Sequence, residues 1–332
     1  MNKICIIGGG NLGLVCSGVL ASKGYQVNIL SGHPENWSRE LIITDADGKH
    51  FIGSPALITA DAAAAVAGVD MILLCLPGYL IEETLKRIKP FLAPSVIVGS
   101  IVASTGFFFF AHDVLPGWPL FGFQRVPFIS RTVEYGRSGL LLGYKKELNV
   151  AVENIPDVPS FLTEIQRMFS TPVSLLDTFY EAALTNSNPI LHTARLYSMW
   201  SGEVTPVPNN SHFYAEWTDE ASSLMIEMDR EFQSLLKALN VREGAVPTLL
   251  DYYESTDAAS LTRKIRSIEA FKPIMSPMIQ TPQGWIPDFN SRYFTEDFPF
   301  GLQFIKQLAD KHNIPSPHIT QVLQWGLSKT PK

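Results

Sequence analysis

This chain of 332 residues has few cysteines, no excess of positive charge and few unbroken apolar runs. The three cysteines, Cys5, Cys16 and Cys75, cannot all pair, and none belongs to a C-x-x-C motif. This pattern argues against a disulfide framework and a cysteine-based metal site, and it favours a reducing compartment. Acidic residues outnumber basic ones by 32 to 26, for a net charge of −6, so we expect no nucleic-acid partner.

Two uncharged stretches, residues 4–22 and 90–111, imitate a signal peptide and a membrane span. The first has three consecutive glycines in its middle, which would break a signal helix, and no A-x-A cleavage site follows. The second contains two prolines and two glycines and is more typical of a turn, a buried strand and a loop. We therefore expect a cytoplasmic protein with no membrane partner.

The first half of the chain alternates short apolar runs with helix-length segments. Strands are predicted over residues 3–7, 26–30, 71–76, 95–98, 139–143, 148–152 and 173–176. Helices are predicted over residues 11–23, 60–67, 80–89 and 159–169. Strands that alternate with helices imply parallel β-α-β units, so residues 1–178 are expected to form a Rossmann-type, doubly wound and mostly parallel sheet.

The pattern changes near Asp177, beyond which the apolar spacing is mostly helical. Helices are predicted over residues 179–200, 218–239, 258–268, 299–312 and 319–327. Proline-rich connectors lie between them at residues 205–210 and 272–288. We therefore expect a second, all-helical domain over residues 179–332.

The most specific local signal is Gly8-Gly9-Gly10-Asn11-Leu12-Gly13, a G-x-G-x-x-G sequence that follows a predicted strand and opens a helix. In such a loop Gly8 permits the tight turn, Gly10 lets the backbone approach a pyrophosphate, and Gly13 allows close helix–strand packing. Free N–H groups at the helix start, at Asn11 and Leu12, then face the phosphates. The alternative is a glycine-rich turn without a ligand, which the strand–turn–helix context disfavours.

The end of the second strand separates NAD from NADP sites, because an acidic residue there binds the ribose 2′-hydroxyl of NAD. This chain has Ser31 instead, followed by Arg39. A small residue leaves room for a 2′-phosphate that Arg39 could bind, although an ordinary surface loop is the alternative. We expect an NAD(P)H site that favours NADP(H), with Leu76 and Pro77 along the cofactor at the end of a neighbouring parallel strand.

Two segments of the helical half contain candidate catalytic groups. Asn188 lies four residues before His192, so both can share one face of a helix. Taken alone, such a histidine is more often a hydrogen-bonded structural residue. Residues 291–302 set Arg292 and Asp297 among aromatic side chains just before a predicted helix, where helix capping alone would explain a carboxylate.

Four sequence segments together resemble the octopine/nopaline (opine) dehydrogenase family over nearly the whole chain. They are GGGNLG at residues 8–13, GFQRVP at 122–127 followed by Arg131 and EYG at 134–136, NSNPILH at 186–192, and SRYFTEDFPFGL at 291–302. The resemblance implies a 6-phosphogluconate-dehydrogenase-like plan and an oxidoreductase that joins an amino acid to a 2-oxo acid by reductive condensation.

The same resemblance implies a role for three residues of the helical half. His192 would be the catalytic general acid–base, Asp297 its carboxylate partner, and Arg292 a clamp for an anionic group. Thr193 stands where the family often has proline, and the chain is short for the family, so the identity of the two substrates stays open.

The chemistry of these residue types suits that reaction. Imine formation needs an unprotonated amine and then protonation of the departing oxygen, and a histidine can do both. An adjacent carboxylate holds one tautomer and stabilises the imidazolium. Substrate carboxylates suit arginine, which makes Arg125 and Arg131 further substrate-binding candidates. Asn188 and Gln124 are the other two substrate-binding candidates. Each of these arginines could instead form a surface ion pair.

Two other functions stay open on the sequence alone. A ketopantoate-reductase-like or 3-hydroxyacid dehydrogenase usually relies on a lysine in the first helix of its second domain, and residues 179–200 contain none. A non-catalytic NAD(P)-binding sensor would not need the set of His192, Asp297 and Arg292. The expected partners are a small-molecule amino acid and a 2-oxo acid, and both a monomer and a homodimer remain open.

Overall fold

The computed structural model describes residues 1–329, apart from the side chain of Thr105. The chain divides into two compact units, residues 1–185 and 186–332. The first unit includes helix α6 (Phe179–Ala183), which packs against strands of its sheet and so lies on the near side of the division. The expected boundary between residues 178 and 179 stays a prediction.

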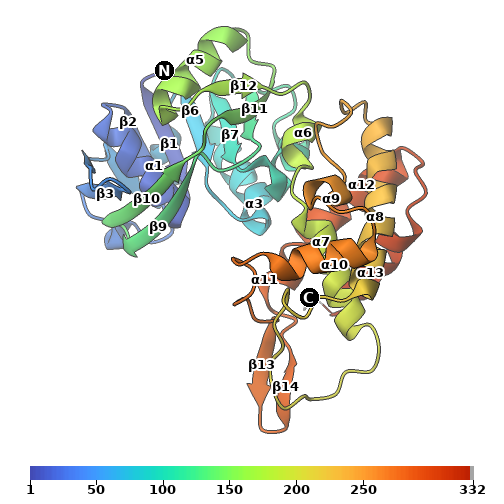
Figure 1. Ribbon diagram of the computed structural model, residues 1–332. Helices are drawn as coiled ribbons and strands as arrows, with labels where there is room; N and C mark the ends of the chain where they lie inside the picture. The colour runs from blue at the N-terminus through green and yellow to red at the C-terminus, as the bar shows by residue number, and fades with distance from the viewer. Residues whose placement is uncertain (330–332) are drawn as a thin grey trace. The chain divides into compact units, whose positions relative to one another are not determined.

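The first unit is built on an eight-stranded sheet with the strand order β12-β11-β8-β7-β6-β1-β2-β5 (Figure 1). Its strands are β1 (Lys3–Ile7), β2 (Gln26–Leu30), β5 (Leu57–Thr59), β6 (Met71–Leu74), β7 (Ile97–Ile101), β8 (Leu120–Phe123), β11 (Leu148–Glu153) and β12 (Val173–Leu175). Every neighbouring pair is parallel except β8 with β11. The predicted Rossmann-type, mostly parallel sheet is confirmed.

Helices cover this sheet and follow the predicted β-α-β order. They are α1 (Asn11–Ser22), α2 (Ala62–Val66), α3 (Gly78–Ile88), α4 (Phe107–Val114), α5 (Val158–Phe169) and α6. Helix α2 begins at Asp61, whose carboxylate accepts hydrogen bonds from the N–H groups of Ala63 and Ala64. The prediction of a loop at the end of the stretch 90–111 is wrong, because residues 107–111 form the start of α4. That helix has no capping side chain that could mark its start, and it follows Gly106 in a left-handed conformation.

A second, four-stranded sheet covers the outer side of α1. It has the order β4-β3-β10-β9 and consists of β3 (Leu41–Asp45), β4 (His50–Gly53), β9 (Phe128–Glu134) and β10 (Ser138–Tyr144). The predicted strand 139–143 therefore lies here and not in the main sheet. Because α1 is covered on both sides, residues 13–20 are all buried, as a helix that is apolar all round should be. Gly18 permits this packing, since a Cβ there would lie 2.5 Å from Cγ1 of Ile43.

The second unit is mostly helical. It contains α7 (Asn188–Trp200), α8 (Asp219–Ala238), α9 (Leu249–Tyr252), α10 (Ala258–Ser267), α11 (Arg292–Thr295), a π-helical turn η4 (Phe298–Leu302), α12 (Gln303–Lys311) and α13 (Pro317–Lys329). The all-helical prediction misses one element, the hairpin of β13 (Met278–Thr281) and β14 (Gly284–Pro287), which Figure 1 shows extending from the helices. The hairpin lies inside residues 272–288, which were predicted to be a connector because they are rich in proline.

The helix predicted over residues 179–200 is two helices, α6 and α7. The break comes before Pro189, which occupies the first turn of α7, where a missing N–H costs nothing. This start places His192 one turn into α7. No helix within residues 1–329 is long and apolar enough to cross a membrane.

Candidate active site and dinucleotide loop

Both ring nitrogens of His192 have close partners. Nδ1 lies 2.8 Å from Oδ2 of Asp297, and Nε2 lies 2.7 Å from Oη of Tyr214. An ionised carboxylate only accepts hydrogen bonds, so this network assigns a proton to Nδ1, and the Tyr214 hydroxyl then donates to Nε2 of the neutral ring. The result is a hydrogen-bonded chain of carboxylate, imidazole and phenol, with the histidine 8% exposed.

One backbone hydrogen bond and two close packing contacts of the π-helical turn η4 position Asp297. The N–H of Leu302 donates to the carbonyl of Asp297 at 2.8 Å, five residues back, which gives the turn its width. Gly301 lies against Pro189 of α7, where a Cβ would come within 2.6 Å of the proline ring. On the other side, Phe298 packs so closely on Gly326 of α13 that a Cβ there would clash with its ring. Gly301 therefore lets the turn carrying Asp297 approach the helix that carries His192, and Gly326 lets the same turn pack on α13.

Aromatic rings surround the imidazole. Tyr293 lies 4.7 Å from it between ring centroids and Phe213 lies 5.8 Å away, while Tyr214 stacks on Phe271 at 4.3 Å. Burial raises the pKa of both Tyr214 and Tyr293, and the nearby charge of Asp297 adds to both shifts. Both phenols therefore stay neutral hydrogen-bond donors.

Arg195 fixes the segment that carries Tyr214. Its Nε donates to the carbonyl of Phe213 at 3.1 Å and its Nη2 to the carbonyl of Glu216 at 2.6 Å. The guanidinium is buried, and this burial lowers its pKa to about 10. Arg195 is thus committed to backbone carbonyls and serves the structure of the site.

The two polar residues predicted beside His192 are not committed in this way. Arg292 begins α11 and is exposed, and its side chain forms no hydrogen bond or ion pair with any residue of the described range 1–329. Asn188 begins α7 one turn before His192, and its backbone N–H donates to Oδ1 of Asn186 at 3.2 Å, while its side chain has no hydrogen-bond partner among residues 1–329. Both side chains therefore remain available for a ligand.

Sequence reasoning missed Tyr214 and Tyr293. Tyr293 stands inside the 291–302 segment, between the arginine and the carboxylate that were singled out, so its position was a usable signal. Tyr214 lies between α7 and α8 in a segment without helical or strand periodicity. No pattern in the sequence indicates that this residue reaches His192.

The glycine-rich loop of the first unit has the shape that a dinucleotide requires. Gly8 has φ +118°, and a Cβ there would clash with the carbonyl oxygen of Cys75. A Cβ on Gly13 would clash with the carbonyl of Gly8, so this glycine is needed for close packing of α1 on β1. Gly10, in contrast, faces open space with no atom within 4 Å of a Cβ. A pyrophosphate fits such a loop.

Leu76 and Pro77 lie at the border of this loop. The Leu76 side chain lies 3.1 Å from the Cβ position of Gly8, and Pro77 caps the start of α3. Leu12 packs its side chain against the core of the unit. For Leu12, therefore, only the backbone N–H is a candidate for phosphate binding.

Three other predicted cofactor contacts differ in their availability. Oδ1 of Asn11 accepts from the N–H of Thr132 on β9 at 2.7 Å, so this side chain already ties the second sheet to the loop. Ser31 Oγ accepts from Nε1 of Trp37 at 3.1 Å, which places the indole beside the small residue that was expected to leave space. Arg39 is exposed, and its side chain forms no hydrogen bond or ion pair with another described residue.

Three substrate-binding candidates of the first unit bind backbone or amide groups. Gln124 accepts from Nδ2 of Asn149 and donates to the carbonyl of Glu181, both at 3.0 Å, so its amide bridges structural elements. Arg125 donates to the carbonyl of Thr185 at 3.2 Å. Arg131, on β9, is exposed, and among the described residues its guanidinium donates to the neighbouring carbonyl of Ser130 at 3.1 Å. Their substrate-binding roles stay predictions.

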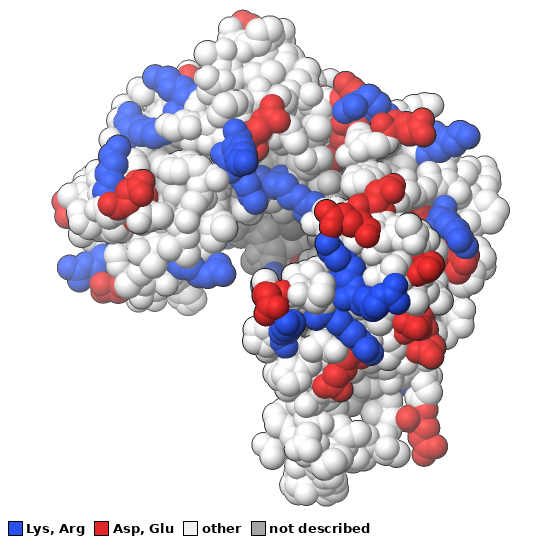
Figure 2. Space-filling model, in the orientation of Figure 1, with Lys and Arg blue, Asp and Glu red and all other residues white. Residues whose placement is uncertain are grey.

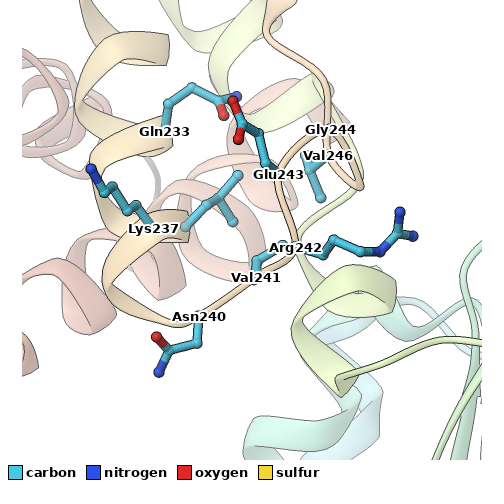
Figure 3. Close-up of a pocket in the computed structure, with 9 residues that line it drawn as sticks. Gln233, Lys237, Asn240, Val241, Arg242, Glu243, Gly244 and Val246 are labelled. Atoms are coloured by element: carbon cyan, nitrogen blue, oxygen red, sulfur yellow. The ribbon is translucent and has the colours of Figure 1, made fainter.

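A hollow at the end of α8 is lined by Gln233, Lys237, Asn240 and Glu243 among others, and it contains none of the candidate site residues (Figure 3). On the face drawn in Figure 2, acidic and basic side chains are interspersed, in keeping with the modest net charge.

Comparisons with known proteins agree with the two parts of the fold. Residues 175–329 match the family described as NAD/NADP octopine/nopaline dehydrogenase, alpha-helical domain, and residues 4–102 match ketopantoate reductase PanE/ApbA. The chain is 25% identical to octopine dehydrogenase of Mizuhopecten yessoensis over 361 residues, covering 99% of this chain and 90% of that protein. It is 23% identical to an opine dehydrogenase of Arthrobacter sp. (strain 1C), covering 96% and 88%.

Solved structures show the same similarity. Octopine dehydrogenase with NADH and L-arginine superposes with a TM-score of 0.87 at 25% identity, covering 99% of this chain and 89% of that one. Yersinopine dehydrogenase with bound NADP⁺ gives a TM-score of 0.75 at 13% identity, which shows the shared fold.

Proposed function

Because this chain belongs to the octopine/nopaline dehydrogenase family, we propose that it joins an amino acid to a 2-oxo acid and reduces the product with NAD(P)H. At the family level it is an NAD(P)-dependent oxidoreductase of the opine dehydrogenase type. The observation that carries the finer proposal is the pairing of His192 with Asp297 at 2.8 Å. Related structures hold NADH with L-arginine or with pyruvate, an amino acid and a 2-oxo acid, which are the substrate classes proposed here. Another holds NADH with agmatine, an amine that lacks the carboxylate of arginine.

His192 would move the protons of the condensation. Nε2 of the neutral ring takes a proton from the substrate ammonium, and the freed amine attacks the carbonyl carbon of the 2-oxo acid. A proton then passes from the attacking nitrogen to the former carbonyl oxygen, which gives a hydroxyl. The imidazolium gives its proton to this hydroxyl, so that water leaves and the C=N bond of a protonated imine forms. Asp297 accepts from Nδ1–H in both states and stabilises the charged one.

Tyr214 would hold the imidazole between these steps. In the neutral state its hydroxyl donates to Nε2, and when Nε2 carries a proton the same oxygen can accept from it. The phenol thus satisfies Nε2 in either protonation state until substrate takes its place. Tyr214 acts through His192 and is a positioning residue in this proposal.

Arg292 would bind a substrate carboxylate. Its guanidinium is exposed and uncommitted within the described residues, and it begins the helix that leads to Asp297. Arginine presents two parallel donors to a carboxylate, which fixes the orientation as well as the charge. Asn188, one turn before His192, offers an amide to the same ligand.

The dinucleotide would be held at the loop of Gly8 to Gly13, beside Leu76 and Pro77. When bound, it supplies the hydride for the reduction. Related structures hold NADH in one case and NADP⁺ in another. The preference for NADP(H) that Ser31 suggests stays a prediction, and Trp37 beside it limits the space on which that prediction depends.

The test is a screen of NAD(P)H oxidation with 2-oxo acids, each with and without individual amino acids, on the wild type and on His192→Ala. We expect oxidation that needs both substrates and that falls roughly 10²- to 10⁴-fold in the variant, as for loss of a general acid–base. Oxidation with a 2-oxo acid alone would instead indicate a ketone reductase. Tight cofactor binding with no turnover in any mixture would indicate a sensor.

A further inference from the structure

Tyr135 places a hydroxyl group against the dinucleotide loop. It lies in the turn between β9 and β10 of the second sheet, outside the Rossmann core. A Cβ on Gly9 would come within 2.5 Å of its Oη and 3.2 Å of Cζ2 of Trp37. The side chain is 43% exposed, and its hydroxyl has no hydrogen-bond partner within the described part of the chain.

The turn that carries Tyr135 is fixed at both ends. The N–H of Thr132 donates to Oδ1 of Asn11 at 2.7 Å, at the start of α1. The N–H of Ser38 donates to the carbonyl of Gly136 at 2.8 Å. Gly136 itself has φ +68°, and a Cβ there would clash with the carbonyl of Asn36. The hydroxyl is therefore held between the phosphate loop and the loop after β2.

This arrangement explains a glycine that the dinucleotide motif does not require. In G-x-G-x-x-G only the first, third and sixth positions have assigned roles, and Gly9 occupies a free one. Any side chain at residue 9 would displace the Tyr135 hydroxyl. The next residue, Gly10, faces open space that suits a phosphate.

We propose that Tyr135 is a cofactor-binding residue whose hydroxyl donates a hydrogen bond to the ribose–pyrophosphate part shared by NADH and NADPH. An unpaired donor fixed beside a loop built for a dinucleotide has the position and chemistry for this contact. The second sheet then contributes directly to the cofactor site as well as covering α1. The inference rests on the dinucleotide of the proposed function, and it is independent of the proposed substrates.

The first experiment titrates NADH and NADPH by fluorescence against the wild type and Tyr135→Phe. We expect both dissociation constants to rise by roughly tenfold, in the range for a hydrogen bond to a charged group. Tyr144→Phe is the matched control, because Tyr144 ends β10 of the same sheet and is also 43% exposed. Unchanged affinity in Tyr135→Phe, or a loss confined to NADPH, would overturn the proposal.

A second experiment tests the contact without cofactor, by thermal unfolding of a double-mutant cycle. Gly9→Ala should lower Tm in the wild type and lower it less in a Tyr135→Ala background, because the clashing hydroxyl is then gone. Equal shifts in both backgrounds would contradict the contact. A wild type that binds neither dinucleotide would refute both proposals, whereas normal binding without turnover would refute the proposed reaction alone.

Discussion

Asp297→Asn tests whether the carboxylate beside His192 serves proton transfer. The substitution keeps the size of the side chain and the packing of the π-helical turn, but it removes the negative charge that accepts from Nδ1. An amide can also present its NH₂ group to Nδ1, which would favour the tautomer with the proton on Nε2. That tautomer cannot take a proton from the substrate ammonium.

The size of the effect follows from the geometry. The pair is 2.8 Å apart, and the two side chains are only 11% and 16% exposed, so solvent screens the interaction weakly. A hydrogen bond of this charged type contributes about 1.5–3 kcal/mol. If that amount is lost from the transition state, kcat falls about 10- to 150-fold. Reversal of the tautomer would lower it further.

The assay is the loss of NAD(P)H absorbance at saturating amino acid and 2-oxo acid. Glu231→Gln is the matched control, because it alters a second histidine–carboxylate pair of the same unit, His318 with Glu231 at 2.7 Å. We expect this control to keep kcat within about twofold, since its histidine has no proposed part in the chemistry. An Asp297→Asn variant with normal cofactor affinity, normal Tm and unchanged kcat would refute the proposed role of the pair.

Four further predictions concern single residues. Tyr214→Phe keeps the stacking on Phe271 and removes one hydrogen bond to His192, so kcat should fall roughly 3- to 10-fold with little change in Tm; an equal or higher kcat would mean that the hydroxyl only blocks Nε2. Arg292→Ala should raise KM for an anionic substrate more than it lowers kcat, which initial-rate kinetics would measure. Gly10→Asp should abolish binding of reduced cofactor in a fluorescence titration while the fold persists, because the open space at Gly10 would hold a repelling carboxylate. Burial raises the pKa of Asp229, so the stabilisation from its protonated side chain is complete below the unfolded pKa and is lost as pH rises through the raised folded pKa. The free energy of unfolding, measured by denaturant titration from about pH 4 to 7, should therefore change in favour of Asp229→Asn over the wild type as pH increases.

Local patterns predict the parts of this fold that depend on neighbouring residues. The Rossmann strands and the loop from Gly8 to Gly13 were predictable, because β-branched runs and required glycines act within a few residues. The second sheet was not predicted as a separate layer, since its packing on α1 depends on contacts such as Gly18 with Ile43. Tyr214 reaches His192 through the placement of a loop held by Arg195, and no periodicity encodes such a placement.

His192–Asp297 and His318–Glu231, two histidine–carboxylate pairs of the helical unit, differ in what else the carboxylate does. Glu231 accepts from the side chain of His318 and also from the N–H groups of His318 and Ile319, so it caps the start of α13. A carboxylate that accepts from unsatisfied N–H groups at a helix start has a structural role. The capping alternative for Asp297 does not match its contacts, since no side-chain capping bond of Asp297 to η4 is formed.

Asp297 is bonded to His192, which in turn meets a buried phenol at its other nitrogen. Helix capping is enough to explain why Glu231 lies beside His318. The contact of Asp297 instead orients the imidazole of His192. An orienting carboxylate is needed where a histidine must hold one tautomer and then carry a charge. The contrast within a single unit therefore favours proton transfer over helix capping as the reason for this pair.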